Sequence, residues 1–138
     1  MIRNLFVFLF LVSFVFANNL TNPQTIYQKK CQMCHAMDYP ETLEEKRAQV
    51  APNILMVMRN ISIGIEAVEE PKNKEELRKL VIEFMNDYIF EPTAQKSYCE
   101  EVIFKHFDYM PSLKGFISKQ EAQIVVPWVY DTFSPKKD

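Results

Sequence analysis

Glycine is nearly missing from this chain. Gly64 and Gly115 are its 2 glycines among 138 residues, and no stretch shows the apolar–polar alternation that half-buried strands require. Internal repeats and low-complexity linkers are also lacking, whereas the helix-favouring residues Glu, Lys, Leu and Met are common. The composition therefore predicts an all-α protein of one domain, with helices joined by short loops.

Apolar periodicity and capping residues mark where these helices should lie. Asn22 and Asn73 are candidate N-caps, and two capping boxes pair a hydroxyl residue with a glutamate three positions later. The capping boxes begin at Thr42 and Ser118. The predicted helices cover residues 23–32, 42–51, 54–68, 73–90, 94–107 and 118–133.

An excess of positive charge is also lacking. The 16 Lys and Arg residues are outnumbered by 18 Asp and Glu residues, which gives a formal charge of −2. Nucleic-acid binding depends on clustered positive charge that neutralises phosphates. The composition gives no electrostatic reason for a nucleic-acid partner, and we expect none.

A run long enough to span a membrane is missing, although the N-terminus is apolar. Arg3 precedes an apolar run over residues 5–16, and Ala17 follows. This order is typical of a secretory signal peptide, and a bilayer span needs roughly 20 apolar residues. We predict a signal peptide over residues 1–17, a periplasmic domain over residues 18–138 and no permanent membrane span. Retention of the N-terminus as a tether is the alternative.

Cysteine is scarce, and its count is odd. The 3 cysteines are Cys31, Cys34 and Cys99. In an exported chain, an odd count leaves at least one thiol outside a disulfide within the chain. A covalently attached cofactor would explain this count.

The segment CQMCH places Cys31, Cys34 and His35 within about one helical turn. Side chains at this spacing face the same way, so two thiols can form thioethers with the two vinyl groups of a haem while the histidine reaches the iron. C-x-x-C-H is the motif of c-type haem attachment. We predict one covalently bound haem c whose iron is ligated by His35.

Three other uses of CQMCH stay open. A zinc site could combine Cys31 and Cys34 with Cys99 and His106. A thioredoxin-like dithiol would need a strand–helix context, which the sequence does not offer. The first two cysteines could also form a plain structural disulfide.

A second iron ligand has to come from elsewhere in the chain. Met110 stands in FDYMPSLKG between two predicted helices, and the following Pro111 restricts it to extended conformations. Such a segment can hold a thioether at a fixed point, so we predict Met110 as the second axial ligand. The other candidates are His106, Cys99, Met33, Met37, Met56, Met58 and Met85. We expect Met56 and Met58 in the core or in the wall of a haem pocket, and Met85 as core filler.

CQMCH, MPSLKG and a final helix with Trp128 and Tyr130 together resemble a small monohaem class I c-type cytochrome over most of residues 18–138. The resemblance implies a cytochrome c-like helical domain wrapped around one haem. It also implies haem attachment at the two cysteines of CQMCH, with His35 and Met110 as axial ligands.

The resemblance further implies two contacts within the fold. The first and last helices should cross, which would set Ile26 and Tyr27 against Val125, Trp128 and Val129. The stretch APNI is similar to the family's Gly-Pro-x-Leu, with alanine in place of the glycine. In that family the proline carbonyl accepts a hydrogen bond from the second ring nitrogen of the histidine, so Pro52 would orient His35.

Ligation by His and Met leaves the iron no open position for a substrate and raises its reduction potential. We therefore expect a monomeric periplasmic carrier of single electrons and no enzymatic activity. Its partners would be other exported redox proteins, an electron donor and an acceptor. The alternative is a haem-based sensor, or a subunit of a periplasmic redox enzyme, with an open distal site or one influenced by Cys99.

Overall fold

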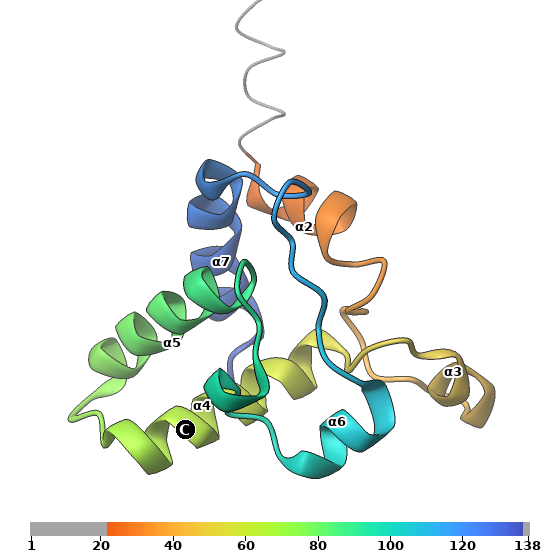
Figure 1. Cartoon of the computed structure of the whole chain (residues 1–138), viewed down its shortest axis with the longest axis horizontal. Coiled ribbons are helices and arrows are strands. Elements are labelled where there is room, and N and C mark those ends of the chain that lie inside the picture. Colours follow the sequence, from red (N-terminus) through yellow and green to blue (C-terminus); the bar gives the residue numbers. More distant parts are fainter. Residues whose placement is uncertain (1–21, 137–138) are drawn as a thin grey trace, which may run out of the picture.

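The computed structural model describes residues 22–136, and these residues form an all-helical fold, as the composition predicts (Figure 1). The predicted signal peptide lies outside them. Within this range, the pairing of β type is limited to an isolated bridge between Lys114 and Ile117, and none of the helices combines the length and apolarity that a membrane span requires. The elements are α2 (Pro23–Lys30), α3 (Leu43–Ala48), α4 (Ile54–Glu69), α5 (Lys74–Tyr88), the 3₁₀ turn η1 (Ala94–Lys96), α6 (Glu101–Phe107) and α7 (Lys119–Phe133).

Helices begin where the capping residues predict. Both capping boxes are present, Thr42 with Glu45 before α3 and Ser118 with Glu121 before α7. Asn73 caps α5 through its side-chain oxygen. These side chains satisfy N–H groups of the first turn, which have no acceptor within the helix. The starts of these helices are therefore set by local sequence.

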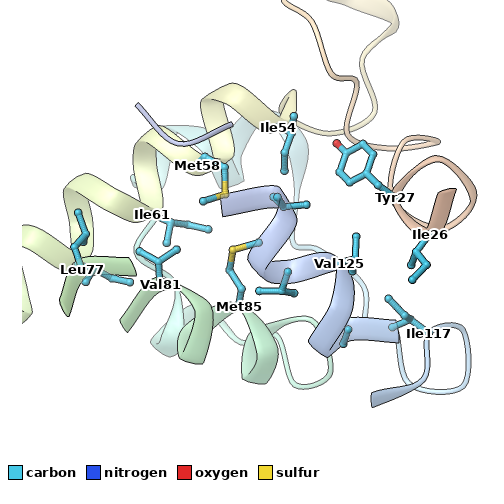
Figure 2. Close-up of a cluster of buried hydrophobic side chains, with 14 residues drawn as sticks. Ile26, Tyr27, Ile54, Met58, Ile61, Leu77, Val81, Met85, Ile117 and Val125 are labelled. Atoms are coloured by element: carbon cyan, nitrogen blue, oxygen red, sulfur yellow. The ribbon is translucent and has the colours of Figure 1, made fainter. Parts of the chain in front are cut away.

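The core lies where α4, α5 and α7 meet (Figure 2). Met58 of α4 and Val81 of α5 are fully buried there, and Val125 comes from α7. Met85, which we expected as core filler, is also buried. Each fully buried side chain of this kind contributes roughly 1.5–3 kcal/mol through removal of apolar surface from water. The three helices thus form the frame on which the remaining segments lie.

Helix α2 packs on α7, the contact that the resemblance implied. Ile26 and Tyr27 are the buried residues of α2, and the Tyr27 ring lies 5.7 Å from Trp128 and 5.8 Å from Phe133, measured between ring centroids. Aromatic pairs at this separation stabilise beyond the area they bury. This contact fixes α2, and with it the start of CQMCH, against the frame.

The predicted single helix over residues 94–107 is wrong. The chain forms η1, leaves helical geometry, and starts again as α6. Before η1, Thr93 Oγ1 caps the turn by accepting a hydrogen bond from Lys96 N at 3.3 Å. Between η1 and α6, Ser97 Oγ accepts one from Cys99 N at 3.1 Å. Hydroxyl side chains can bind nearby N–H groups in non-helical conformations, which competes with helix formation.

Gly64 lets the segment after η1 approach α4 closely. A Cβ atom at position 64 would lie 2.6 Å from Tyr98 Cβ and 2.9 Å from Tyr98 O. The Tyr98 ring meets Phe84 of α5 edge-on at 4.9 Å, and its hydroxyl lies 3.2 Å from Glu69 of α4. The segment is therefore packed against two helices of the frame.

Candidate functional site

CQMCH leaves α2 as a turn, so the predicted helix over residues 23–32 is two residues too long. The carbonyl of Tyr27 accepts from both Cys31 N (2.8 Å) and Gln32 N (3.0 Å), which closes the helix. The carbonyl of Cys31 then accepts from Cys34 N at 3.1 Å and His35 N at 2.9 Å. The two cysteines and the histidine thus belong to one hydrogen-bonded turn.

All three cysteines are free thiols, so the disulfide reading of CQMCH is not realised. Cys31 packs against the core. Burial, and secondly the nearby Cys34, raises the pKa of the Cys31 thiol to about 11, so it is neutral at pH 7. A redox-active dithiol depends on a lowered thiol pKa, and the environment of Cys31 therefore argues against a thioredoxin-like function.

The imidazole of His35 has a defined partner. Its Nδ1 lies 2.8 Å from the Pro52 carbonyl oxygen, the contact that the resemblance implied. A carbonyl oxygen can only accept, so Nδ1 carries the proton and Nε2 keeps a free lone pair. Burial lowers the pKa of His35, and the bond to Pro52 opposes part of that shift. A neutral imidazole with a free Nε2 is the form in which histidine binds a metal.

The main chain at His35 is held as well. The Tyr27 hydroxyl donates to the His35 carbonyl oxygen at 2.6 Å, and Ile54 N donates to the carbonyl of Ala36 at 2.9 Å. Sequence reasoning placed Tyr27 only against the last helix. The one indication of a second role was its position a single turn before Cys31, which aims both side chains in a similar direction.

Met110 lies half-buried on the segment between α6 and α7. After it, Ser112 Oγ donates to the Phe90 carbonyl oxygen at 2.6 Å and Leu113 N donates to the Ile89 carbonyl oxygen at 2.8 Å. The segment is therefore tied to the end of α5 directly after the methionine. Its pairing with His35 across a haem stays a prediction.

A lysine links the Met110 segment to the end of α2. Lys30, the residue before CQMCH, donates from Nζ to the Phe116 carbonyl oxygen at 2.6 Å. The same ammonium group lies 4.6 Å from the centroid of the Phe116 ring, within the range of a cation–π interaction. The fold thus brings the end of the MPSLKG segment to the start of CQMCH, across 86 positions of sequence.

The other ligand candidates are engaged elsewhere or exposed. Met58 and Met85 are buried in the core, as expected. His106 is exposed on α6, where its ring meets Phe107 edge-on at 4.5 Å. Met33, within CQMCH, is 68% exposed. Met37 and Met56 are half-buried, as Met110 is, and Met37 packs against the core. Met110 differs from both in that the segment directly after it is tied to the end of α5.

The zinc reading of the cysteines finds no support. It required Cys31, Cys34, Cys99 and His106 to converge. Over residues 22–136, no group of three or more His, Cys, Asp or Glu side chains is arranged to hold a metal ion. Cys99 is instead half-buried, and burial raises its pKa.

Large apolar side chains are exposed in the segments that flank the site. They come from residues 33–50, around α3, and from residues 102–116, around α6, and Figure 1 shows both helices on the same side of the molecule. These side chains are Met33, Tyr39, Leu43, Val50, Val102, Tyr109 and Phe116.

Comparison with known proteins gives one relative and no function. A curated protein of Aquifex aeolicus (strain VF5), described as an uncharacterized protein, is 29% identical over 141 residues, which is 95% of this chain and 88% of that protein. No protein-family model matches the chain. No solved structure matches it either.

Proposed function

We propose that the chain is a small monohaem class I c-type cytochrome that carries single electrons in the periplasm. The observation that carries the proposal is the state of His35 in the CQMCH turn. Its Nδ1 proton is engaged by the Pro52 carbonyl at 2.8 Å, which leaves Nε2 free for iron. Two free thiols, Cys31 and Cys34, lie on the same turn.

In this proposal each residue has one task. Cys31 and Cys34 would hold the haem through two thioether links, and His35 and Met110 would ligate its iron. Pro52 orients the imidazole. When bound, the haem supplies a one-electron iron couple. Because burial lowers the pKa of His35, the imidazole is already neutral and has no proton to lose before it binds a metal.

The exposed apolar side chains are a second support. A porphyrin is a broad apolar ring, and the segments that carry the proposed ligands also carry large apolar groups exposed to water, among them Met33, Tyr109 and Phe116. Covering such groups with a haem would bury them at a gain of roughly 25 cal/mol per Å². The residues present therefore suit a haem in both chemistry and polarity.

The anchoring of both segments suits electron transfer. CQMCH is held by α2 and by the stretch before α4, and the Met110 segment is held by the end of α5 and by Lys30. Ligands held by such hydrogen bonds keep their positions when the charge on the metal changes. Electron transfer then requires little rearrangement of the site. With His and Met as ligands there is no open position, so we propose a carrier between exported redox proteins and not an enzyme.

An absorption spectrum of the purified protein tests the cofactor. We expect a c-type spectrum and a pigment that acid–acetone does not extract, because thioether bonds are covalent. A colourless protein, or a pigment that is extracted, would end the proposal. Zinc in a metal analysis of the colourless protein would favour the metal-site reading.

The distal ligand is tested by Met110→Ala. We expect the weak far-red band of the oxidised protein to disappear in Met110→Ala and to persist in Met33→Ala, which removes an exposed thioether. Persistence of the band in Met110→Ala would exclude this methionine as the ligand. Tight binding of carbon monoxide to the reduced wild-type protein would point to an open site, hence to a sensor or enzyme subunit.

A further inference from the structure

We propose that Tyr27 is a positioning residue for His35, which holds the imidazole in place by fixing the carbonyl group of the same residue. The inference rests on the proposed ligation of haem iron by His35. It assigns to the Tyr27 hydroxyl a role separate from that of its ring, which packs α2 on α7.

The hydroxyl is held at a defined point. Tyr27 is 1% exposed, and its ring is enclosed by Trp128 at 5.7 Å and Phe133 at 5.8 Å. Figure 2 shows the hydroxyl pointing away from α2, and it donates to the His35 carbonyl oxygen at 2.6 Å. A ring fixed by two aromatic neighbours therefore presents its donor to one acceptor, the main chain of the proposed ligand.

This bond completes a set of three around His35. Pro52 O accepts from the ring at 2.8 Å, and Ile54 N donates to Ala36 O at 2.9 Å. Pro52 lies just before α4, and Ile54 is the first residue of that helix. Tyr27 supplies the opposing contact, from α2, so the imidazole is held from two elements. Without it, the His35 carbonyl loses its contact with α2, and the loop can move in a way that loosens the bond from Nδ1 to Pro52.

The expected consequence follows from the Nδ1–H bond. A histidine that donates this proton to a carbonyl becomes a more basic ligand, which stabilises the oxidised metal. If loss of the Tyr27 hydroxyl loosens that bond, His35 becomes less basic and the midpoint potential rises. The Nδ1 proton would also be released more often and exchange faster with water.

The test uses Tyr27→Phe, which removes the hydroxyl and keeps the ring. In the haem-loaded, reduced protein, nuclear magnetic resonance would follow exchange of the His35 Nδ1 proton, and a redox titration would give the midpoint potential. We expect exchange about fivefold faster or more, the factor that corresponds to the loss of one hydrogen bond. We also expect an upward shift of the potential.

Two controls separate positioning from general stability. Val81→Ala truncates a fully buried residue of α5 and should lower the Tm without changing either readout. Tyr98→Phe removes another tyrosine hydroxyl, the one that lies beside Glu69, and should also leave both unchanged.

The outcomes are distinct. A haem spectrum together with wild-type exchange and potential in Tyr27→Phe would overturn this inference and leave the proposed function standing. A wild-type protein that binds no haem would overturn both this inference and the proposed function. Equal changes in Tyr27→Phe and Val81→Ala would show that only stability had been altered, which also overturns the positioning role.

Discussion

Gly64 is the residue at which α4 has least room for a side chain. An added Cβ would meet Tyr98 Cβ at 2.6 Å and the Tyr98 carbonyl oxygen at 2.9 Å, and a backbone atom cannot turn away as a flexible side chain could. Alanine is favoured over glycine inside a helix by about 1 kcal/mol, whereas overpacking costs roughly 1–3 kcal/mol. We expect Gly64→Ala to lower the free energy of unfolding by up to about 2 kcal/mol in urea titrations.

The propensity contribution can be measured on the same helix. Ala67 is exposed, so Ala67→Gly reports the cost of glycine in α4 without a steric change. Adding that cost to the measured effect of Gly64→Ala gives the steric penalty alone. A stabilised Gly64→Ala would contradict the close approach of Tyr98.

At this scale the sequence predicts the chemistry of the site better than its support. CQMCH is local, so its three reactive residues are readable as a motif. The Pro52 contact followed from a resemblance and is present at 2.8 Å. The Tyr27 contact was missed because it depends on the turn that CQMCH makes after α2. The sequence predicted a longer helix there, in which the His35 carbonyl would not be expected to meet the Tyr27 hydroxyl.

Lys30 joins two elements that are far apart in sequence, the end of α2 and the segment before α7. It donates to the Phe116 carbonyl oxygen at 2.6 Å and lies 4.6 Å from the Phe116 ring centroid. Lys30→Met keeps the aliphatic stem and removes both polar contacts. We expect a loss of about 1 kcal/mol in the free energy of unfolding, since an exposed charged hydrogen bond and a cation–π contact are each worth a fraction of their buried values.

Lys29→Met is the matched control for Lys30→Met. Lys29 is the preceding, exposed lysine of the same helix. Its substitution removes one positive charge but leaves the contacts between Lys30 and Phe116 in place. We expect this variant to change stability by less than about 0.5 kcal/mol. Equal losses in the two variants would show that charge alone, and not the link between segments, is responsible.

Element by element, helix starts were predictable and the connection between α5 and α7 was not. Capping boxes act over three residues, so the boxes at Thr42 and Ser118 could be read directly. The 94–107 stretch has helical composition, but Ser97 uses its hydroxyl to bind Cys99 N at 3.1 Å, and Tyr98 packs against Gly64. Tertiary packing overrode propensity there, which a local pattern cannot reveal.

In the molecule as a whole, ion pairs join the frame on its outside. Asp131 of α7 accepts two hydrogen bonds from Arg78 of α5, both at 2.8 Å. The hydrogen bond from Arg78 lowers the pKa of Asp131. In the same way, Ser118 lowers the pKa of Glu121 and Lys114 lowers that of Glu91. Three carboxylates in different parts of the fold are thus more acidic folded than unfolded.

These shifts predict that acid destabilises the fold. A group whose pKa is lower in the folded state stabilises it above the unfolded pKa, near 4 for Asp and Glu, and loses that contribution as the pH falls through the folded value. Asp131→Asn should therefore cost about 0.5–1 kcal/mol at pH 7, as expected for an exposed pair with good geometry, and much less near pH 2. Urea titrations at both pH values measure this cost. Glu83→Gln is the control, because Glu83 and Lys79 form a weaker ion pair, with a long separation of 3.8 Å. An equal cost of Asp131→Asn at pH 7 and pH 2 would mean that the Arg78 pair contributes nothing through its charge.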